Sequence, residues 1–438
     1  MARNRSLRRK GRQPVSPGFR KPPGPVRRRR IVYIAGYDPR PPEGATYSLL
    51  KREVERYCEN RPVSFDLSPV AHAPDGETAS WTLALEAEGW RCEAEYLFLR
   101  WDDIVARDFA RWFPERVLRS FVTLLDYLLS GTLFAMGKAF HRTAILWLYP
   151  FIAIAGILAL AVLAGLWAAD AFSGAAMGTA AGIAVFVVVA AIGAWFTRFT
   201  FIQHLADLWC FLRDFAIGKR PDMEARCERF ADYVLDAVRR DDVDETILVG
   251  HSYGTMMVVE ATARALARDA DAFSSGSPVS VLTLGSCINT SSLHPRAQAR
   301  KASVSRVAGL EHVMWAEIQG RQDMINYFQD DPAVAAGLPE DDTRANPVVR
   351  TFSLRDVLSG STYNRFSLNY FRMHFQTICA NDVSHPWDYF LAVAGPDPLA
   401  GRLSLDYWRE RERNSKNFMR QSVPVLAAFP GLPRTPSN

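Results

Sequence analysis

The sequence of 438 residues predicts an α/β fold, a mostly parallel sheet flanked by helices, with an inserted transmembrane helical hairpin. Short apolar runs such as 31–35 and 246–249 are rich in β-branched residues, which is typical of buried strands in a parallel sheet. Amphipathic helical patterns alternate with these runs, as they do in βαβ units. Between Arg142 and Arg198 the only charged residue is Asp170, which indicates a segment embedded in a bilayer.

Residues 1–30 form a basic segment that precedes the first expected strand. They include twelve Lys or Arg, five Pro and no acidic residue, a composition typical of a disordered tail. The segment has no apolar run, which argues against a secretory signal peptide. We expect this tail to contact anionic lipid headgroups rather than nucleic acid, because a membrane segment follows in the same chain.

Residues 31–116 are expected to form the first part of the α/β domain. The strand at 31–35 leads into a glycine loop at 36–39, the position at which a parallel sheet presents its functional loops. The other elements expected here are a helix over 45–57 and strand-like runs near 63–71, 79–88 and 92–99.

Two consecutive segments, 117–142 and 143–197, are expected to contact the membrane in different ways. Within 143–197, two uncharged stretches of 27 residues flank Asp170, and about 20 apolar residues suffice to cross a bilayer. They predict a hairpin of two spanning helices. Asp126 interrupts the apolar pattern of 117–142, so we expect an interfacial or cap helix there. Small residues that favour close helix packing recur every four positions: Gly174, Gly178 and Gly182.

Basic residues around the hairpin predict its orientation. Lys138 and Arg142 precede it, Arg198 and Arg213 follow it, and the connecting turn has none, so both ends are expected to face the cytoplasm. Six scattered cysteines without a CxxC pair are expected to be free thiols, which agrees with a reducing compartment. Aromatic residues near the ends of the two stretches are expected at the headgroup level: Trp147, Tyr149, Trp167 and Trp195.

Residues 250–254 read GHSYG, the pattern GxSxG centred on Ser252. A buried strand is predicted directly before this pattern, and an amphipathic helix begins directly after it. In a strand-turn-helix frame the glycines permit a tight turn, while the first N–H groups of the helix point toward the serine. This context favours a nucleophilic Ser252 over the alternative that the serine only tightens a βα turn.

A serine nucleophile requires a histidine base and an acid that orients the histidine. Asp323 is the best-placed acid, because it follows a predicted strand that ends near Gln319 and therefore lies at the carboxyl edge of the sheet. The other acids of this region fall in a polar stretch and are expected to be solvated surface charges: Asp330, Asp331, Asp341 and Asp342.

Two histidines follow the acid in the sequence. His374 is framed by aromatic and apolar residues, as a base over a pocket would be, whereas His385 precedes a proline in a predicted turn. We favour His374 and keep His385 as the alternative. His251 lies inside the pattern itself and is expected to pack or hydrogen-bond locally.

These segments together resemble the membrane-associated α/β-hydrolase-fold proteins of bacteria, which are lipase-like or esterase-like. The similarity covers most of residues 31–400. The segments that carry it are 36–39 (GYDP), 100–103 (RWDD), 250–254 (GHSYG), 315–323 and 371–375.

The resemblance implies a serine hydrolase with a Ser252-His374-Asp323 triad and an oxyanion hole formed by the N–H groups of Tyr37 and Tyr253. It implies an ester or thioester substrate, with lipid-derived acyl esters as one class of candidate. It implies no cofactor and no metal. The chain would be anchored in the cell inner membrane with its catalytic domain in the cytoplasm.

Residues 198–400 would then form the second part of the α/β-hydrolase domain, and 401–438 a C-terminal helix and tail. A different class of function stays open, namely a non-catalytic membrane scaffold or binding protein on the same fold. The order serine, acid, histidine favours the enzyme, because a scaffold has no need of it.

Overall fold

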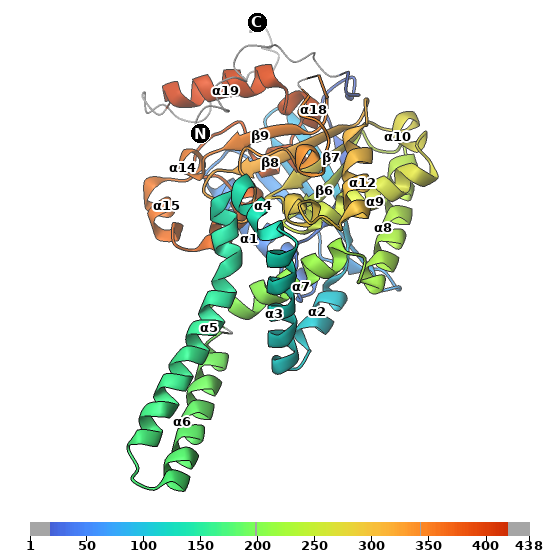
Figure 1. Ribbon diagram of the computed structural model, residues 1–438. Coiled ribbons are helices and arrows are strands. Elements are labelled where there is room, and N and C mark those ends of the chain that lie inside the picture. Colours follow the sequence, from blue (N-terminus) through green and yellow to red (C-terminus); the bar gives the residue numbers. More distant parts are fainter. Residues whose placement is uncertain (1–17, 198, 342, 419–438) are drawn as a thin grey trace, which may run out of the picture.

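The computed structural model describes residues 18–418 except 198 and 342, and it contains one mixed sheet in the order β2-β4-β5-β1-β6-β7-β8-β9, with β3 paired to β4 (Figure 1). The predicted tail lies outside the described residues up to residue 17. The strands are β1 Arg28–Ile34, β2 Ser64–Leu67, β3 Ala71–His72, β4 Thr78–Ala87, β5 Trp90–Leu99, β6 Glu245–His251, β7 Val279–Leu284, β8 Met314–Gly320 and β9 Val348–Phe352.

The part of the sheet from β5 to β9 is parallel, while β4 runs antiparallel to both β5 and β2. Every residue of β6 and β7 is buried, as expected of central strands covered on both faces. The predicted α/β fold with a mostly parallel sheet is therefore confirmed. The strand β9 was not predicted, because Arg350 and Thr351 interrupt its apolar residues. Of its five residues only the last, Phe352, is buried.

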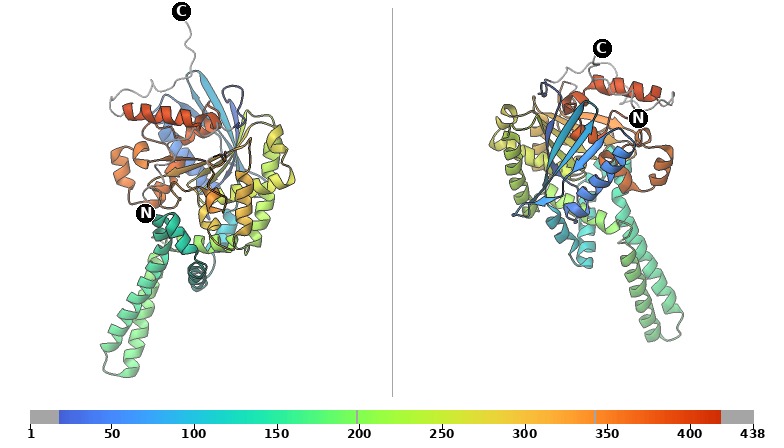
Figure 2. Two further views of the ribbon diagram at one scale, coloured as in Figure 1. Left: turned by 45° about the horizontal axis from the view of Figure 1, so that its top comes forward. Right: turned by 180° about the vertical axis from the view of Figure 1, so that it is seen from behind.

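Helices cover both faces of the sheet (Figure 2). One face packs on α7 Ile202–Ala216, α8 Pro221–Arg239, α9 Gly254–Arg268 and α12 Gln298–Ala308. The other packs on α1 Thr46–Glu59, α14 Leu354–Val357, α16 Tyr370–Phe375, α17 Tyr389–Ala394 and α18 Leu399–Arg402. Shorter or peripheral helices are α2 Asp102–Phe109, α10 Ala272–Ser275, α11 Ile288–Ser292, α13 Pro332–Ala335, α15 Gly360–Phe366 and α19 Leu405–Phe418.

The first strand begins earlier than predicted, at Arg28, so three arginines assigned to the tail belong to the sheet. Arg29 is fully buried and makes two hydrogen bonds to the Glu245 carboxylate, at 2.8 and 3.0 Å. Arg30 pairs with Glu95 and Asp242. A buried guanidinium is tolerated where carboxylates neutralise it, and these partners lie far away in the sequence.

The predicted hairpin is present as α5 His141–Asp170 and α6 Ala175–Phe196, two helices long and apolar enough to span a membrane (Figures 1 and 2). They lie side by side and project from the body. A Cβ atom on Gly182 would lie 2.8 Å from the carbonyl oxygen of Gly165, and one on Gly178 would lie 2.6 Å from that of Ala169. Gly174 takes no part in this close packing.

Two residues assigned to the hairpin's surroundings have other roles. Trp147, predicted at the headgroup level, is fully buried against Trp209 of the body, because the first turns of α5 pack on the domain rather than on lipid. Arg213, counted among the residues that set the orientation, is paired with Asp126 and Asp214.

The segment 117–142 was predicted as one helix, and the structure places two helices over it, α3 Phe113–Leu129 and α4 Thr132–Ala139, which meet at an angle of 74°. Gly131 lies between them with φ +74°, a conformation that glycine adopts without strain. Asp126 does not interrupt α3, because its carboxylate faces the body and binds His294, Arg213 and Arg296.

Candidate active site

The turn at Ser252 joins the buried strand β6 to helix α9. Ser252 has φ +57°, a left-handed conformation that costs a non-glycine residue roughly 1–3 kcal/mol. The surrounding structure holds it there, since its N–H donates to the carbonyl of Leu284 at 2.9 Å and its carbonyl accepts from the Thr255 hydroxyl at 2.6 Å. Backbone strain of this kind concentrates at functional sites.

The two glycines of the pattern allow main chains to meet closely around Ser252. A Cβ atom on Gly250 would lie 2.5 Å from the carbonyl oxygen of Gly254. A Cβ atom on Gly254 would overlap the carbonyl oxygen of Ile34 in β1. The start of α9 therefore packs directly on the two neighbouring strands, and any larger residue would move Ser252.

Asp323 and His374 lie together in the structure, as the sequence interpretation expected. The Nδ1 atom of His374 is 2.8 Å from Oδ2 of Asp323, and both side chains are buried. Asp323 also accepts a hydrogen bond from the N–H of Ile325 at 2.8 Å. Burial opposes ionisation of Asp323, but its contact with His374 and its hydrogen bonds hold the pKa below the ordinary value.

Ser252 and His374 are brought together by the end of β7. Gly285 follows Leu284, the partner of the Ser252 amide, and has φ +57°. A Cβ atom on Gly285 would lie 2.8 Å from Cε1 and 3.1 Å from Nδ1 of His374. The His251 ring, next to Ser252 in the chain, lies 5.0 Å from the His374 ring.

The histidine has a nitrogen free for proton transfer. Nε2 of His374 is buried and has no hydrogen-bond partner within the described residues. The Ser252 side chain lies near the Cys287 thiol, and within the described residues no hydrogen bond joins it to this nitrogen. Hydrogen bonds of catalytic groups are often long before substrate binds, and an imidazole nitrogen without a partner is able to accept or donate a proton.

The oxyanion candidates lie on either side of Ser252. A Cβ atom on Gly36 would lie 2.8 Å from Cβ and 3.1 Å from Oγ of Ser252, so the loop after β1 passes directly beside the serine. The phenols of both tyrosines bind interior groups, Tyr37 to Asp108 at 3.0 Å and Tyr253 to Ser291 at 2.8 Å. Among the described residues, no acceptor binds the backbone N–H of Tyr37 or Tyr253.

Three residues support the site in ways that were not predicted from the sequence. Gly285 provides space for the imidazole, Thr255 holds the carbonyl of Ser252, and Trp101 donates from Nε1 to the carbonyl of Ala35 at 3.0 Å, next to the loop at Gly36. Gly285 carried a signal, since a glycine directly after a buried strand marks a tight turn or a close approach. Thr255 had no such signal, and Trp101 belongs to the segment 100–103 on which the family resemblance rests.

His385, the alternative base, makes other contacts. His385 accepts a hydrogen bond at Nδ1 from the N–H of Trp387 and packs near Phe352 and Trp408. The carboxylate of Asp323, in contrast, pairs with His374.

The prediction that the acids after Asp323 are solvated was wrong for two of them. Asp330 binds the Asn289 side chain, and burial raises its pKa to about 6. Asp331 caps α13 and pairs with Arg344. Asp341 is exposed, and Asp342 lies outside the described residues.

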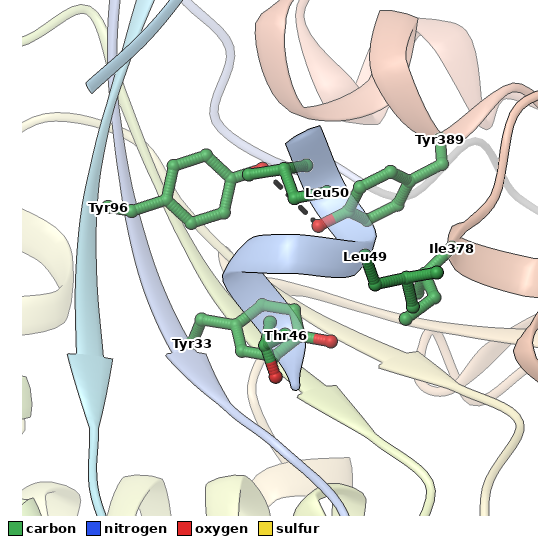
Figure 3. Close-up of a pocket in the computed structure, with 7 residues that line it drawn as sticks. All are labelled: Tyr33, Thr46, Leu49, Leu50, Tyr96, Ile378 and Tyr389. Atoms are coloured by element: carbon green, nitrogen blue, oxygen red, sulfur yellow. Dashed lines mark hydrogen bonds between the residues drawn. The ribbon is translucent and has the colours of Figure 1, made fainter. Parts of the chain in front are cut away.

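A small cavity lies between α1 and the sheet (Figure 3). Its volume of about 10 Å³ admits roughly one water molecule. Phenol groups face it, and those of Tyr96 and Tyr389 are 3.3 Å apart. It is too small to receive an acyl chain. Its lining is Tyr33, Thr46, Leu49, Leu50, Tyr96, Ile378 and Tyr389.

Metal-ligating and thiol side chains are scattered over the described part of the chain. No group of three or more His, Cys, Asp or Glu side chains there could hold a metal ion. The six cysteines are free and, apart from the half-buried Cys58, buried. Burial raises the pKa of the Cys287 thiol, so it stays protonated beside Ser252. Comparisons with protein-family models, curated proteins and solved structures find no match to this chain.

Proposed function

We propose that this chain is a membrane-anchored serine hydrolase of the α/β-hydrolase type, lipase-like or esterase-like, that cleaves an ester or thioester. The observation that carries the proposal is the combination of a strained Ser252 with a buried Asp323-His374 pair whose second imidazole nitrogen is unpaired. A serine, a base and an orienting acid are the groups that acyl transfer requires.

In the proposed reaction, Oγ of Ser252 bonds to the carbonyl carbon while its proton passes to Nε2 of His374. The carbonyl oxygen becomes an oxyanion held by the N–H groups of Tyr37 and Tyr253. Collapse breaks the bond to the leaving oxygen or sulfur, which takes the proton from His374. Water then repeats the sequence on the acyl-enzyme, releases the acid and restores Ser252. Asp323 orients the imidazole and stabilises its protonated form.

The proposed serine hydrolase activity is tested by labelling the membrane-embedded chain with a fluorophosphonate probe and by measuring ester hydrolysis. We expect Ser252→Ala to lose both, and His374→Ala to lose hydrolysis by several orders of magnitude. The matched control is His385→Ala, which should keep most of the activity. Labelling that persists in Ser252→Ala would place the nucleophile elsewhere. A parent chain that neither labels nor hydrolyses any ester would favour the scaffold.

We also propose that the hairpin crosses the cell inner membrane with the catalytic domain on the cytoplasmic side. The support is the apolar length of α5 and α6 together with Lys138 and Arg142 at its base. Cysteine introduced at Ser173, in the turn between the two helices, should react with a membrane-impermeant reagent from outside the cell. Cysteine at Gly218, two residues after the end of α7, should not. The reverse labelling pattern would show that the catalytic domain lies on the outer side of the membrane.

A further inference from the structure

Exposed apolar side chains are confined to one region of the described chain. Every large hydrophobic residue with high exposure lies between residues 112 and 201 or at Leu368 and Tyr370. The hairpin accounts for many of these, but others belong to α3, α4 and the links after α6 and before α16. Soluble surfaces rarely present apolar area of this extent, and such area marks contact with a protein or a membrane.

Helix α3 has its apolar face turned outward. After Phe113 at its start, its exposed apolar residues are spaced by three and four positions: Leu118, Phe121, Val122, Leu125, Leu128 and Leu129. Its opposite face holds buried Ser120 and Thr123 together with Asp126, whose carboxylate binds Arg213 of α7. Tyr127 is also buried on the side of the domain, so apolar side chains lie on both faces of α3. This pattern fits a helix that meets lipid with one face and the domain with the other.

The segment before His374 belongs to the same exposed region. Leu368 is 84% exposed and Tyr370 45% exposed at the start of α16. The next residue, Phe371, stacks on Phe201 with ring centroids 4.1 Å apart. Phe201 lies in the link that leaves the hairpin, so this contact places the first turn of α16 beside the base of α5 and α6.

We name the exposed apolar side chains of α3 and α4, of Phe199 and Phe201, and of Leu368 and Tyr370 the apolar collar. The collar is continuous with the candidate membrane spans through the Phe201-Phe371 contact. Lys138 and Arg142, at the junction of α4 with α5, are exposed and form no ion pair with any described acid. Unpaired positive charge beside apolar surface suits anionic lipid headgroups.

The base of the hairpin also contacts the elements of the candidate site. The Thr143 hydroxyl, in the first turn of α5, donates to the carbonyl of Met324 at 2.8 Å, one residue after Asp323. The His204 ring, in the first turn of α7, packs edge-on against both Tyr37 and Phe371, with centroids 5.8 Å apart in each case. The site therefore lies directly at the hairpin base.

From these contacts we infer that the apolar collar lies in the headgroup layer of the bilayer that the hairpin crosses. Helix α16 then meets the lipid surface next to His374, and long-chain acyl esters held in the bilayer reach Ser252 without passing through water. The membrane contact stands on the exposed surface alone, while the substrate class rests on the proposed function.

Membrane contact is tested with an environment-sensitive fluorophore on Leu368→Cys in vesicles of phosphatidylcholine and phosphatidylglycerol. The matched control is Ala302→Cys, exposed on α12 in the body, and the labelled parent gives the background of native cysteines. We expect phosphatidylcholine brominated near the headgroup to quench the fluorophore at 368 but not at 302, and aqueous iodide to do the reverse. Equal iodide quenching at both positions would overturn the inference. Protection of position 368 from both quenchers would also overturn it, because a second copy of the chain would then cover the collar.

Substrate delivery is tested with two esters, a long-chain ester held in the bilayer and a soluble short-chain ester. The measured quantity is the ratio of the rate of hydrolysis of the first to that of the second. Leu368→Asp should lower this ratio about tenfold, the equivalent of roughly 1.4 kcal/mol of lost lipid contact, while Ala302→Asp should leave it unchanged. An unchanged ratio in Leu368→Asp would overturn delivery from the bilayer. If the parent hydrolyses neither ester, the proposed function fails, and the quenching measurement still decides the membrane contact.

Discussion

Replacing Gly285 by alanine should disturb the geometry of the candidate site much more than it lowers the stability of the fold. Gly285 lies at the end of β7 with φ +57°, between the strand that holds the Ser252 amide and the imidazole of His374. An alanine there adds one methyl group and no charge. The new atom would meet the imidazole and would also lie 3.4 Å from Oδ2 of Asp323.

The size of the effect follows from the distances. The added Cβ would lie 2.8 Å from Cε1 of His374, whereas carbon atoms in contact prefer about 3.5 Å or more. The imidazole must therefore retreat by roughly 0.7 Å, and a misplacement of about 1 Å can lower a rate about 100-fold. The left-handed backbone adds a stability cost of about 1–2 kcal/mol for alanine. We expect kcat to fall about 100-fold and the melting temperature to fall slightly.

The assay is ester hydrolysis and thermal unfolding of the detergent-solubilised chain, with Gly76→Ala as the matched control. Gly76 has φ +69° but nothing within 4 Å of the position of its Cβ, so alanine there causes the same backbone strain without touching the site. The control should lose stability and keep its kcat. If Gly285→Ala kept the kcat of Gly76→Ala, the imidazole of His374 would not take part in the reaction.

The remaining predictions concern two buried ionisable side chains, Glu317 and Arg29. Burial raises the pKa of Glu317 to about 8, so the folded state holds this proton more tightly than the unfolded chain, and the resulting stability is lost as pH rises from about 4.5 through 8. Glu317→Gln, which keeps a neutral partner for Thr283, should raise the melting temperature at pH 8.5 and change it little at pH 5; a stabilisation greater at pH 5 would contradict this. Arg29→Met should destabilise the fold by about 3–5 kcal/mol, because Glu245 remains as an uncompensated buried charge. Adding Glu245→Leu should recover most of that loss in chemical denaturation, and a further loss in the double variant would show that the pair is not coupled.

Local patterns in the sequence were sufficient for most strands of the sheet, though not for β9, and for the turn at Ser252 and the hairpin. An apolar run, a helical period and an uncharged stretch each reflect an environment that neighbouring residues share, so a short window contains the information. Gly250 also acts locally, since the clash that it avoids is with Gly254 and Thr255 of the same turn, whereas the clash that Gly254 avoids is with Ile34 of the distant strand β1.

Only the tertiary structure decided which distant groups meet. His374 lies 51 residues after Asp323, and Arg29 lies 216 residues before Glu245, so no local window contains either pair. Whether Trp147 faces lipid or the domain depended on how far the first turns of α5 are covered by the body. Burial and pairing of polar groups are properties of the packed fold, in which each group must find its partner across the sheet, and the sequence alone determines the candidates but not the contacts.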